Sequence, residues 1–316
     1  MPSRPPSTTP STPSRSALLV AFATLYVVWG STYLAIRIAV MTMPPFVMGA
    51  LRFTAAGGGL YAFLRLRGAP RPSLRNWGAA FVVGVLLLGI SNGMVCWCEQ
   101  WVPSGETALI VATVPLWMTA LPWLGRRGRA PHPAALLGVA IGLLGVATLV
   151  GGAPSGERSA AAGAALMTAR IGLLVASLTW AIGSLWSRRL PLPSEAALAT
   201  AMEMLTAGPV LVVVAAVSGE WGHFRFAAVA PSAWVALAYL GVFGSLAGFG
   251  SYVFLLKHVS AARASTYAFV NPLVAVLLGS LVAGEALTRR TGVAALLIVG
   301  AVGAVIWGSG ARRTDG

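Results

Sequence analysis

The side chains with the most chemical potential in this chain are single polar groups set in or beside apolar runs. Asn92, Cys96 and Glu99 share one helix face at i, i+4 and i+7, with Gln100 beside Glu99. A carboxyl at the end of an apolar helix can carry protons if its surroundings raise its pKa. The alternative is an interfacial glutamate that faces water. We name Glu99 and Gln100 as candidate residues for proton coupling, and refer to this set as the coupling candidates.

Two further charges lie deeper in apolar runs, namely Arg52 and Glu203, at matching points of two similar segments. An unpaired charge inside a membrane costs about 3 kcal/mol or more, so each predicts a partner or a watery cavity. Pairing with each other is one alternative, and a structural partner elsewhere is the other. Both residues join the coupling candidates.

Aromatic, amide and hydroxyl side chains of several runs could line a pocket for a partly apolar ligand. Tyr26, Trp29 and Tyr33 follow at i, i+3 and i+7 on one helix face. Packing in the protein interior is the alternative for each of them. The full set of candidate substrate-binding residues is Tyr26, Trp29, Tyr33, Asn92, Trp180, Ser184, Tyr252, Tyr267 and Asn271.

The residue inventory argues against several other chemistries. Lys257 is the only lysine, so the lysine of a nucleotide-binding P-loop is lacking. Cys96 and Cys98 are two residues apart in an apolar run and point to different helix faces, and the three histidines fall in loops or at run ends. The acids are single and dispersed rather than clustered. We therefore expect no disulfide, no metal, no cofactor and no enzyme activity.

The elements that position these residues are long apolar helices. Hydrophobic residues make up 57% of the chain and charged residues 9%, whereas soluble domains carry roughly 25% charged residues. A membrane span needs about 20 apolar residues. We predict an all-α integral membrane protein with ten spans, at 17–39, 45–64, 77–98, 105–123, 134–150, 170–187, 195–217, 232–255, 264–283 and 292–308.

The distribution of basic residues predicts the orientation of these spans. With the N-terminus in the cytoplasm, 15 of the 22 Lys and Arg residues fall on the inner side and five on the outer side. This is a strong positive-inside signal that places both termini in the cytoplasm. The net charge of +14 is scattered through short loops, so we expect no nucleic-acid partner. Residues 1–16, rich in Pro, Ser and Thr, predict a disordered cytoplasmic tail.

An internal repeat divides the chain into two halves. Segment 29–57 is matched 151 positions later by 180–208, and segment 84–115 is matched 157 positions later by 241–272. Because each half has five spans, an odd number, the second half must be inverted in the membrane. Inverted repeats are common in secondary transporters, although channels can also be duplicated.

We accordingly expect four parts besides the N-terminal tail. The first five-helix repeat covers 17–150, a periplasmic linker 151–169, the second repeat 170–308 and a cytoplasmic tail 309–316.

Several motifs resemble the EamA family of the drug/metabolite transporter (DMT) superfamily, and within it the YedA-like exporters. They are WGSTYLAIRIAV at 29–40, the PPFVMGALRF stretch with Arg52, NGMVCWCEQWVPSGETALIVATVPLW at 92–117, SLTWAIGS at 177–184 and ASTYAFVNPLVAVLLGSLVAGE at 264–285. The resemblance implies a ten-helix inverted repeat around a central cavity. It also implies export, because members of the family export amino acids, metabolites or drugs. It also matches Glu285 to a Leu-Gly-Glu block, but the first half has Arg126 there, so Glu285 ranks below Glu99 as a coupling candidate.

The sequence thus predicts a multi-pass inner-membrane exporter of small amphipathic metabolites, amino acids or drug-like compounds, that works by alternating access. Its expected partners are a small-molecule substrate and the lipid bilayer, with proton coupling left open, and it is expected to be a monomer or homodimer. The alternatives are a passive facilitator or channel, a membrane-embedded enzyme, and a sensor.

Overall fold

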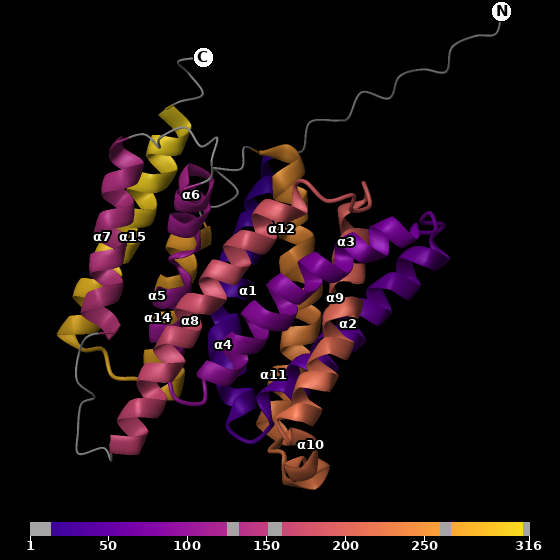
Figure 1. Ribbon diagram of the computed structural model, residues 1–316, viewed down its shortest axis with the longest axis horizontal. Helices are drawn as coiled ribbons and strands as arrows, with labels where there is room; N and C mark the ends of the chain where they lie inside the picture. Colours follow the sequence, from indigo (N-terminus) through magenta and orange to yellow (C-terminus); the bar gives the residue numbers. More distant parts are fainter. Residues whose placement is uncertain (1–13, 125–132, 151–159, 260–266, 312–316) are drawn as a thin grey trace, which may run out of the picture.

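The computed structural model describes residues 14–124, 133–150, 160–259 and 267–311, and every regular element in these ranges is helical (Figure 1). The π-helical segments are η1 and η3, and η2 is a short 3₁₀ turn. In chain order the elements are α1 (Arg15–Val40), α2 (Pro45–Leu66), α3 (Leu74–Gly84), η1 (Val85–Asn92), α4 (Gly93–Cys98), α5 (Ser104–Val111), α6 (Val114–Leu124), α7 (Pro133–Val150), α8 (Ala160–Ser187), α9 (Ala196–Val217), α10 (Glu220–His223), η2 (Phe226–Ala228), α11 (Pro231–Tyr239), η3 (Leu240–Ala247), α12 (Gly248–His258), α14 (Tyr267–Ala283) and α15 (Arg289–Ala311).

Seven helical segments in the described ranges are long and apolar enough to cross a membrane. They are α1, α2, the continuous run α3–η1–α4, α5–α6, α8, α9 and the run from α11 through η3 into α12. Helices α7 and α14 contain shorter apolar stretches, at 133–148 and 270–283. The all-helical membrane fold expected from the sequence is confirmed, while the count of ten spans stays a prediction.

Some helix ends differ from the sequence-based boundaries. Helix α8 begins at Ala160, so the last ten residues of the expected linker are helical, as their alanine-rich sequence favours. Helix α1 begins at Arg15, where the Ser14 hydroxyl accepts a hydrogen bond from the Ala17 amide at 3.1 Å. Helix α15 continues to Ala311. The rest of the predicted tails and linker, residues 1–13, 151–159 and 312–316, lies outside the described residues.

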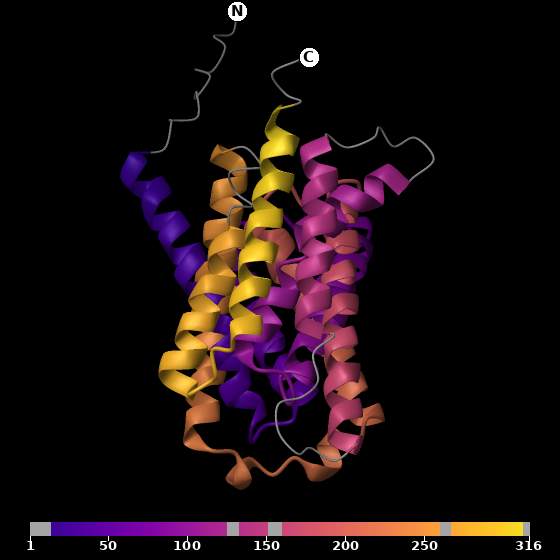
Figure 2. The same ribbon diagram turned by 90° about the vertical axis from the view of Figure 1, so that its left-hand side faces the viewer.

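The helices of the two halves interlock in exchanged pairs. Helix α2 packs on α9 and α7 on α15, while α1 contacts α14 and η3, and α8 contacts α6 and η1 (Figures 1 and 2). Helix α1 starts and α15 finishes at the same end of the bundle, and α8 starts at the opposite end (Figure 2). Each contact between the halves thus has a counterpart in which the equivalent helices are swapped, as expected for a duplicated chain whose second half is inverted.

Small residues allow these pairs to approach closely. A Cβ atom at Gly57 of α2 would lie 3.0 Å from the Ala201 carbonyl oxygen of α9. A Cβ atom at Gly138 of α7 would lie 2.7 Å from the Ala301 carbonyl oxygen of α15. Helices in membranes pack through such small-residue contacts, because lipid offers apolar side chains no hydrophobic incentive to associate.

The third long helix of each half changes its winding at mid-length. In the first half η1 separates α3 from α4, and in the second half η3 separates α11 from α12. π-Helical turns inside α-helices occur frequently at functional sites. Both segments face the centre of the bundle, where they contact α8 and α1 respectively.

Candidate functional site

A central cavity lies between the two halves and receives side chains from both. Six of the nine predicted substrate-binding residues line it, together with Arg52. Those six are Trp29, Tyr33, Asn92, Trp180, Tyr267 and Asn271. The sequence reasoning missed other lining residues, among them Thr32, Ser91 and Phe249. Ser91 adjoins the predicted Asn92, but no spacing signal singles out Phe249 among the phenylalanines of the chain.

Trp29 is the centre of an aromatic cluster in this cavity. Its ring centroid lies 5.2 Å from that of Tyr267 and 5.3 Å from those of Phe249 and Tyr252. The Trp180 ring from the other half meets Trp29 edge-on at 6.4 Å. Edge-to-face contacts of this kind hold rings in fixed orientations. The cluster therefore presents a shaped apolar surface that both halves build.

The position of Trp29 is fixed by the π-helical segment η3 and the start of α12. Its indole Nε1 donates a hydrogen bond to the Gly244 carbonyl oxygen at 3.2 Å. A Cβ atom at Gly248 would lie only 2.4 Å from the same Nε1, so only glycine leaves room for the indole there. Trp29 and the segment from Gly244 to Gly248 thus pack closely against each other.

Asn271 joins α14 to α1 beside the cavity. With its amide nitrogen turned toward α1, it donates hydrogen bonds to the carbonyl oxygens of Tyr26 and Tyr267, each at 3.2 Å. The side chain is buried. Its carbonyl oxygen, which is the other end of the amide, then points away from these two acceptors.

Three predicted residues do not line the cavity. Tyr26 and Ser184 lie about one helical turn beyond Trp29 and Trp180, toward the end that holds both termini. Tyr252 lies behind the cavity wall, with its ring against those of Trp29 and Tyr267. Helix periodicity places these residues on the right face, but periodicity does not set the depth at which a cavity ends.

Arg52 is buried at the cavity wall with few partners. It is 5% exposed, its Nε donates to the Ser245 hydroxyl at 3.0 Å, and its Cζ lies 4.9 Å from the Phe53 ring centroid. Its Nη1 has no hydrogen-bond partner.

The suggested pairing of Arg52 with Glu203 is wrong. Within the described ranges neither forms an ion pair. Both residues lie seven positions from the start of a 22-residue helix, but α2 and α9 run in opposite directions. At 1.5 Å per residue, equivalent positions in such a pair are about 10 Å apart along the helix axis. Glu203 is buried on α9 and does not line the central cavity.

Glu99 lies one residue beyond the end of α4 and outside the cavity lining. It is 0% exposed, and neither carboxyl oxygen has a hydrogen-bond partner. Burial raises the pKa of Glu99 well above its usual value, the charge of Arg37 opposes that rise, and Glu285 adds to it. Arg37 donates to the backbone carbonyl of Glu99. Gln100 turns back on its own chain, its Nε2 donating to the Trp97 carbonyl at 3.0 Å.

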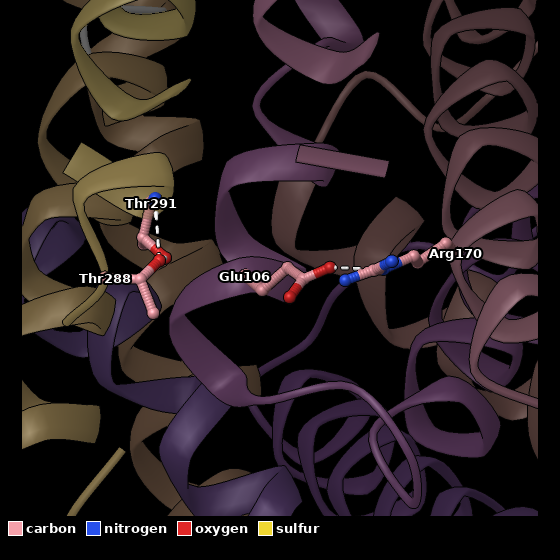
Figure 3. Close-up of polar contacts among 4 residues, drawn as sticks. All are labelled: Glu106, Arg170, Thr288 and Thr291. Carbon is pink, nitrogen blue, oxygen red and sulfur yellow. Dashed lines mark hydrogen bonds and ion pairs between the residues drawn. The ribbon is translucent and has the colours of Figure 1, made fainter. Parts of the chain in front are cut away.

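A second cavity lies at the end of the bundle opposite the termini, and a buried ion pair borders it. Arg170 Nε of α8 lies 2.6 Å from Glu106 Oε1 of α5 (Figure 3), and the two side chains are 3% and 13% exposed. Thr288 and Thr291 stand on the other side of Glu106 at the start of α15 and hydrogen-bond to each other at 2.8 Å. The sequence analysis did not predict this pair, because Arg170 stood at the start of the predicted span 170–187 and no pattern linked it to Glu106.

Glu285, which lines the same cavity, also joins the halves there. Its two carboxylate oxygens accept hydrogen bonds from the backbone amides of Ser104, at 2.7 Å, and Gly105, at 3.0 Å. These amides belong to the N-terminus of α5, where a negative charge is favoured. Glu285 therefore acts as a helix cap supplied by the other half.

Long apolar helices in two interlocked halves around a shared cavity define a membrane transporter architecture. The model of the EamA-like transporter family matches residues 15–151 and 167–307, which is nearly the whole described chain. The chain belongs to this family, and so to the DMT superfamily, as the sequence motifs predicted.

Three curated relatives span almost the same length. The chain is 42% identical over 287 residues to the uncharacterized inner membrane transporter YedA of Escherichia coli K12, covering 90% of this chain and 89% of YedA. It is 26% identical to the uncharacterized transporter YvbV of Bacillus subtilis 168, covering 90% of each chain. It is 22% identical to a probable amino-acid metabolite efflux pump of Salmonella typhimurium LT2, covering 91% of this chain and 94% of that one.

A solved crystal structure shares the fold, with a TM-score of 0.61 at 22% identity, covering 92% of this chain and 98% of the other. The family, the relatives and the apolar helices together confirm the predicted multi-pass inner-membrane location.

Proposed function

We propose that this protein is a secondary transporter that exports small metabolites, amino acids or drug-like compounds, by alternating access of two inverted five-helix repeats. The observation that carries the proposal is the central cavity, to which both halves contribute and where Trp29 meets its repeat counterpart Trp180. A site built between two halves changes its access when one half rocks against the other. The named efflux pump among the relatives supports export.

The proposal includes ten spans, with α7, α14 and α15 added to the seven long apolar segments. The repeats correspond to residues 17–150 and 170–308, and both termini lie in the cytoplasm. The basic residues counted on the inner side support this orientation. On this topology the second cavity faces the periplasm.

Polar contacts between the halves supply a closing device for the periplasmic end. Besides the Glu106–Arg170 pair and the Glu285 cap, Glu220 accepts hydrogen bonds from the amides of Phe46 and Val47 at 2.9 and 3.0 Å. Each contact joins an element of the first half to one of the second. Opening toward the periplasm requires at least some of them to break, because they bridge the parts that must separate.

Proton coupling is part of the proposal, and Glu99 is its carrier. A buried carboxyl without hydrogen-bond partners is stable only when protonated. Arg37, within electrostatic reach, favours the ionised form when the carboxyl is hydrated. A group poised between these two states can take up a proton on one side and release it on the other.

The test is uptake and efflux in proteoliposomes of the purified protein, with labelled amino acids and cationic dyes, with and without an imposed pH gradient. Saturable flux of one compound class, stimulated by the gradient, is the expected result. Flux that rises in proportion to the gradient of the compound without saturating would instead establish a passive facilitator. No flux of any compound would overturn the transporter proposal.

A further inference from the structure

A buried positive charge, Arg52, lines the central cavity and has no counter-charge among the described residues. Eight acidic residues occur in the chain, and six of them lie in the described ranges. Glu106 pairs with Arg170, while Glu220 and Glu285 bind backbone amides. None of the six described carboxyl groups forms an ion pair with Arg52, whose Nη1 is buried without any hydrogen bond.

A buried guanidinium without an ion pair and with an unbonded nitrogen is energetically unfavourable, and an anionic ligand can relieve this penalty. Arginine presents a planar fork of donors that matches a carboxylate, and such pairs are among the strongest hydrogen-bonded contacts in proteins. The Ser245 hydroxyl takes only the Nε donor of Arg52, and the Phe53 ring gives a weaker cation–π contact. Because Arg52 lines the central cavity, its remaining donors are the groups that an anion bound there would meet.

The charge and the aromatic cluster meet on the same short segment. Trp29 donates to the Gly244 carbonyl, and Arg52 donates to the next residue, Ser245. A Cβ atom at Gly244 would lie 3.2 Å from Arg52 Nη2, so η3 also approaches the guanidinium closely. A ligand bound against η3 would therefore have a cation beside one end and aromatic rings beside the other.

We infer that the substrate is an organic carboxylate with an apolar or aromatic body, whose carboxylate pairs with Arg52 while its body packs on the Trp29–Trp180 cluster. This inference rests on the proposed transport function and narrows its substrate class. The fixed cation repels cationic drug-like compounds, so these are poor substrates.

A ligand series on the unaltered protein tests the inference without any risk to folding. The probes are phenylalanine, phenylpropionate, phenylalaninamide and phenethylamine, each used to compete with the uptake of labelled phenylalanine into proteoliposomes. Phenylpropionate keeps the carboxylate without the amine, and the other two keep the amine without the carboxylate. We expect both carboxylates to compete and the two amines to compete about 30-fold less well or worse.

Substitutions of Arg52 then locate the effect. Arg52→Gln is expected to abolish the preference for the carboxylate over the amide, and Arg52→Lys, which keeps the charge but not the fork, is expected to retain part of it. Equal competition by amines and carboxylates, or an unchanged preference in Arg52→Gln, would overturn the inference while leaving transport intact. If neither these probes nor cationic dyes were transported, the proposed function itself would fall.

Discussion

The Glu106–Arg170 ion pair gives the sharpest test of how the two halves are held together. Its side chains are 13% and 3% exposed, so both charges lie largely out of contact with water. Removing one partner of a buried pair typically costs about 3 kcal/mol or more. The neutral Glu106→Gln side chain has the same size, so this loss reports the charge rather than a cavity. With a melting temperature that shifts by about 2 °C per kcal/mol, the expected decrease is roughly 6 °C.

A double-mutant cycle separates the pair from its surroundings. Thermal unfolding of the detergent-solubilised protein is followed by tryptophan fluorescence for Glu106→Gln, Arg170→Gln and the double variant. The double variant should lose clearly less than the sum of the two single losses, because it leaves no buried charge behind. Glu195→Gln, at an N-cap without a side-chain hydrogen bond, is the matched control and should shift stability by no more than about 0.5 kcal/mol. Additive losses, or a single variant that melts like the parent, would refute the reasoning.

Three further predictions concern the cavity, the proposed coupling residue and the helix cap. Gly248→Ala should displace Trp29 and lower transport several-fold, whereas Gly250→Ala, where a Cβ atom meets nothing within 4 Å, should leave the transport rate unchanged; equal rates would contradict the close contact. Because the raised pKa of Glu99 means that the folded protein binds this proton more tightly than the unfolded chain, stability and transport should fall as pH rises toward that pKa, and Glu99→Gln should flatten both profiles. A Glu99→Gln variant with the parental pH profiles would exclude Glu99 as the coupling group. Glu285→Gln should cost about 1 kcal/mol in thermal unfolding through its weaker cap on α5, and an unchanged melting temperature would show that the cap contributes nothing.

Much of the fold could be predicted from sequence because membrane insertion imposes strong local rules. A span must be apolar over its whole length, so hydropathy locates it, and the family motifs add their own order and spacing. Trp29 and Tyr33, which share a helix face, and Trp180, which the repeat links to Trp29, all line the central cavity, while their role in substrate binding stays a prediction. These features can be recognised in the sequence alone, because each depends on residues a few positions apart or on a fixed offset along the chain.

What the sequence could not determine are contacts between elements distant in the chain. It offered pairing of Arg52 with Glu203 as one alternative because the two are repeat equivalents, but inversion places equivalent positions at different depths. It gave no reason to join Glu106 to Arg170, because the two lie 64 residues apart and Arg170 stood at the boundary of a predicted span.

The sequence by itself determined the membrane class, the family and the repeat, since these follow from composition, periodicity and motif order. Only the tertiary structure decided which charges are paired and which is left to meet a ligand. A charge is satisfied by whatever lies within about 4 Å of it, and in an interlocked bundle that neighbour comes from the other half. The burial of Arg52 at the cavity wall, with no hydrogen bond to its Nη1, therefore follows from the packing and not from any local sequence pattern.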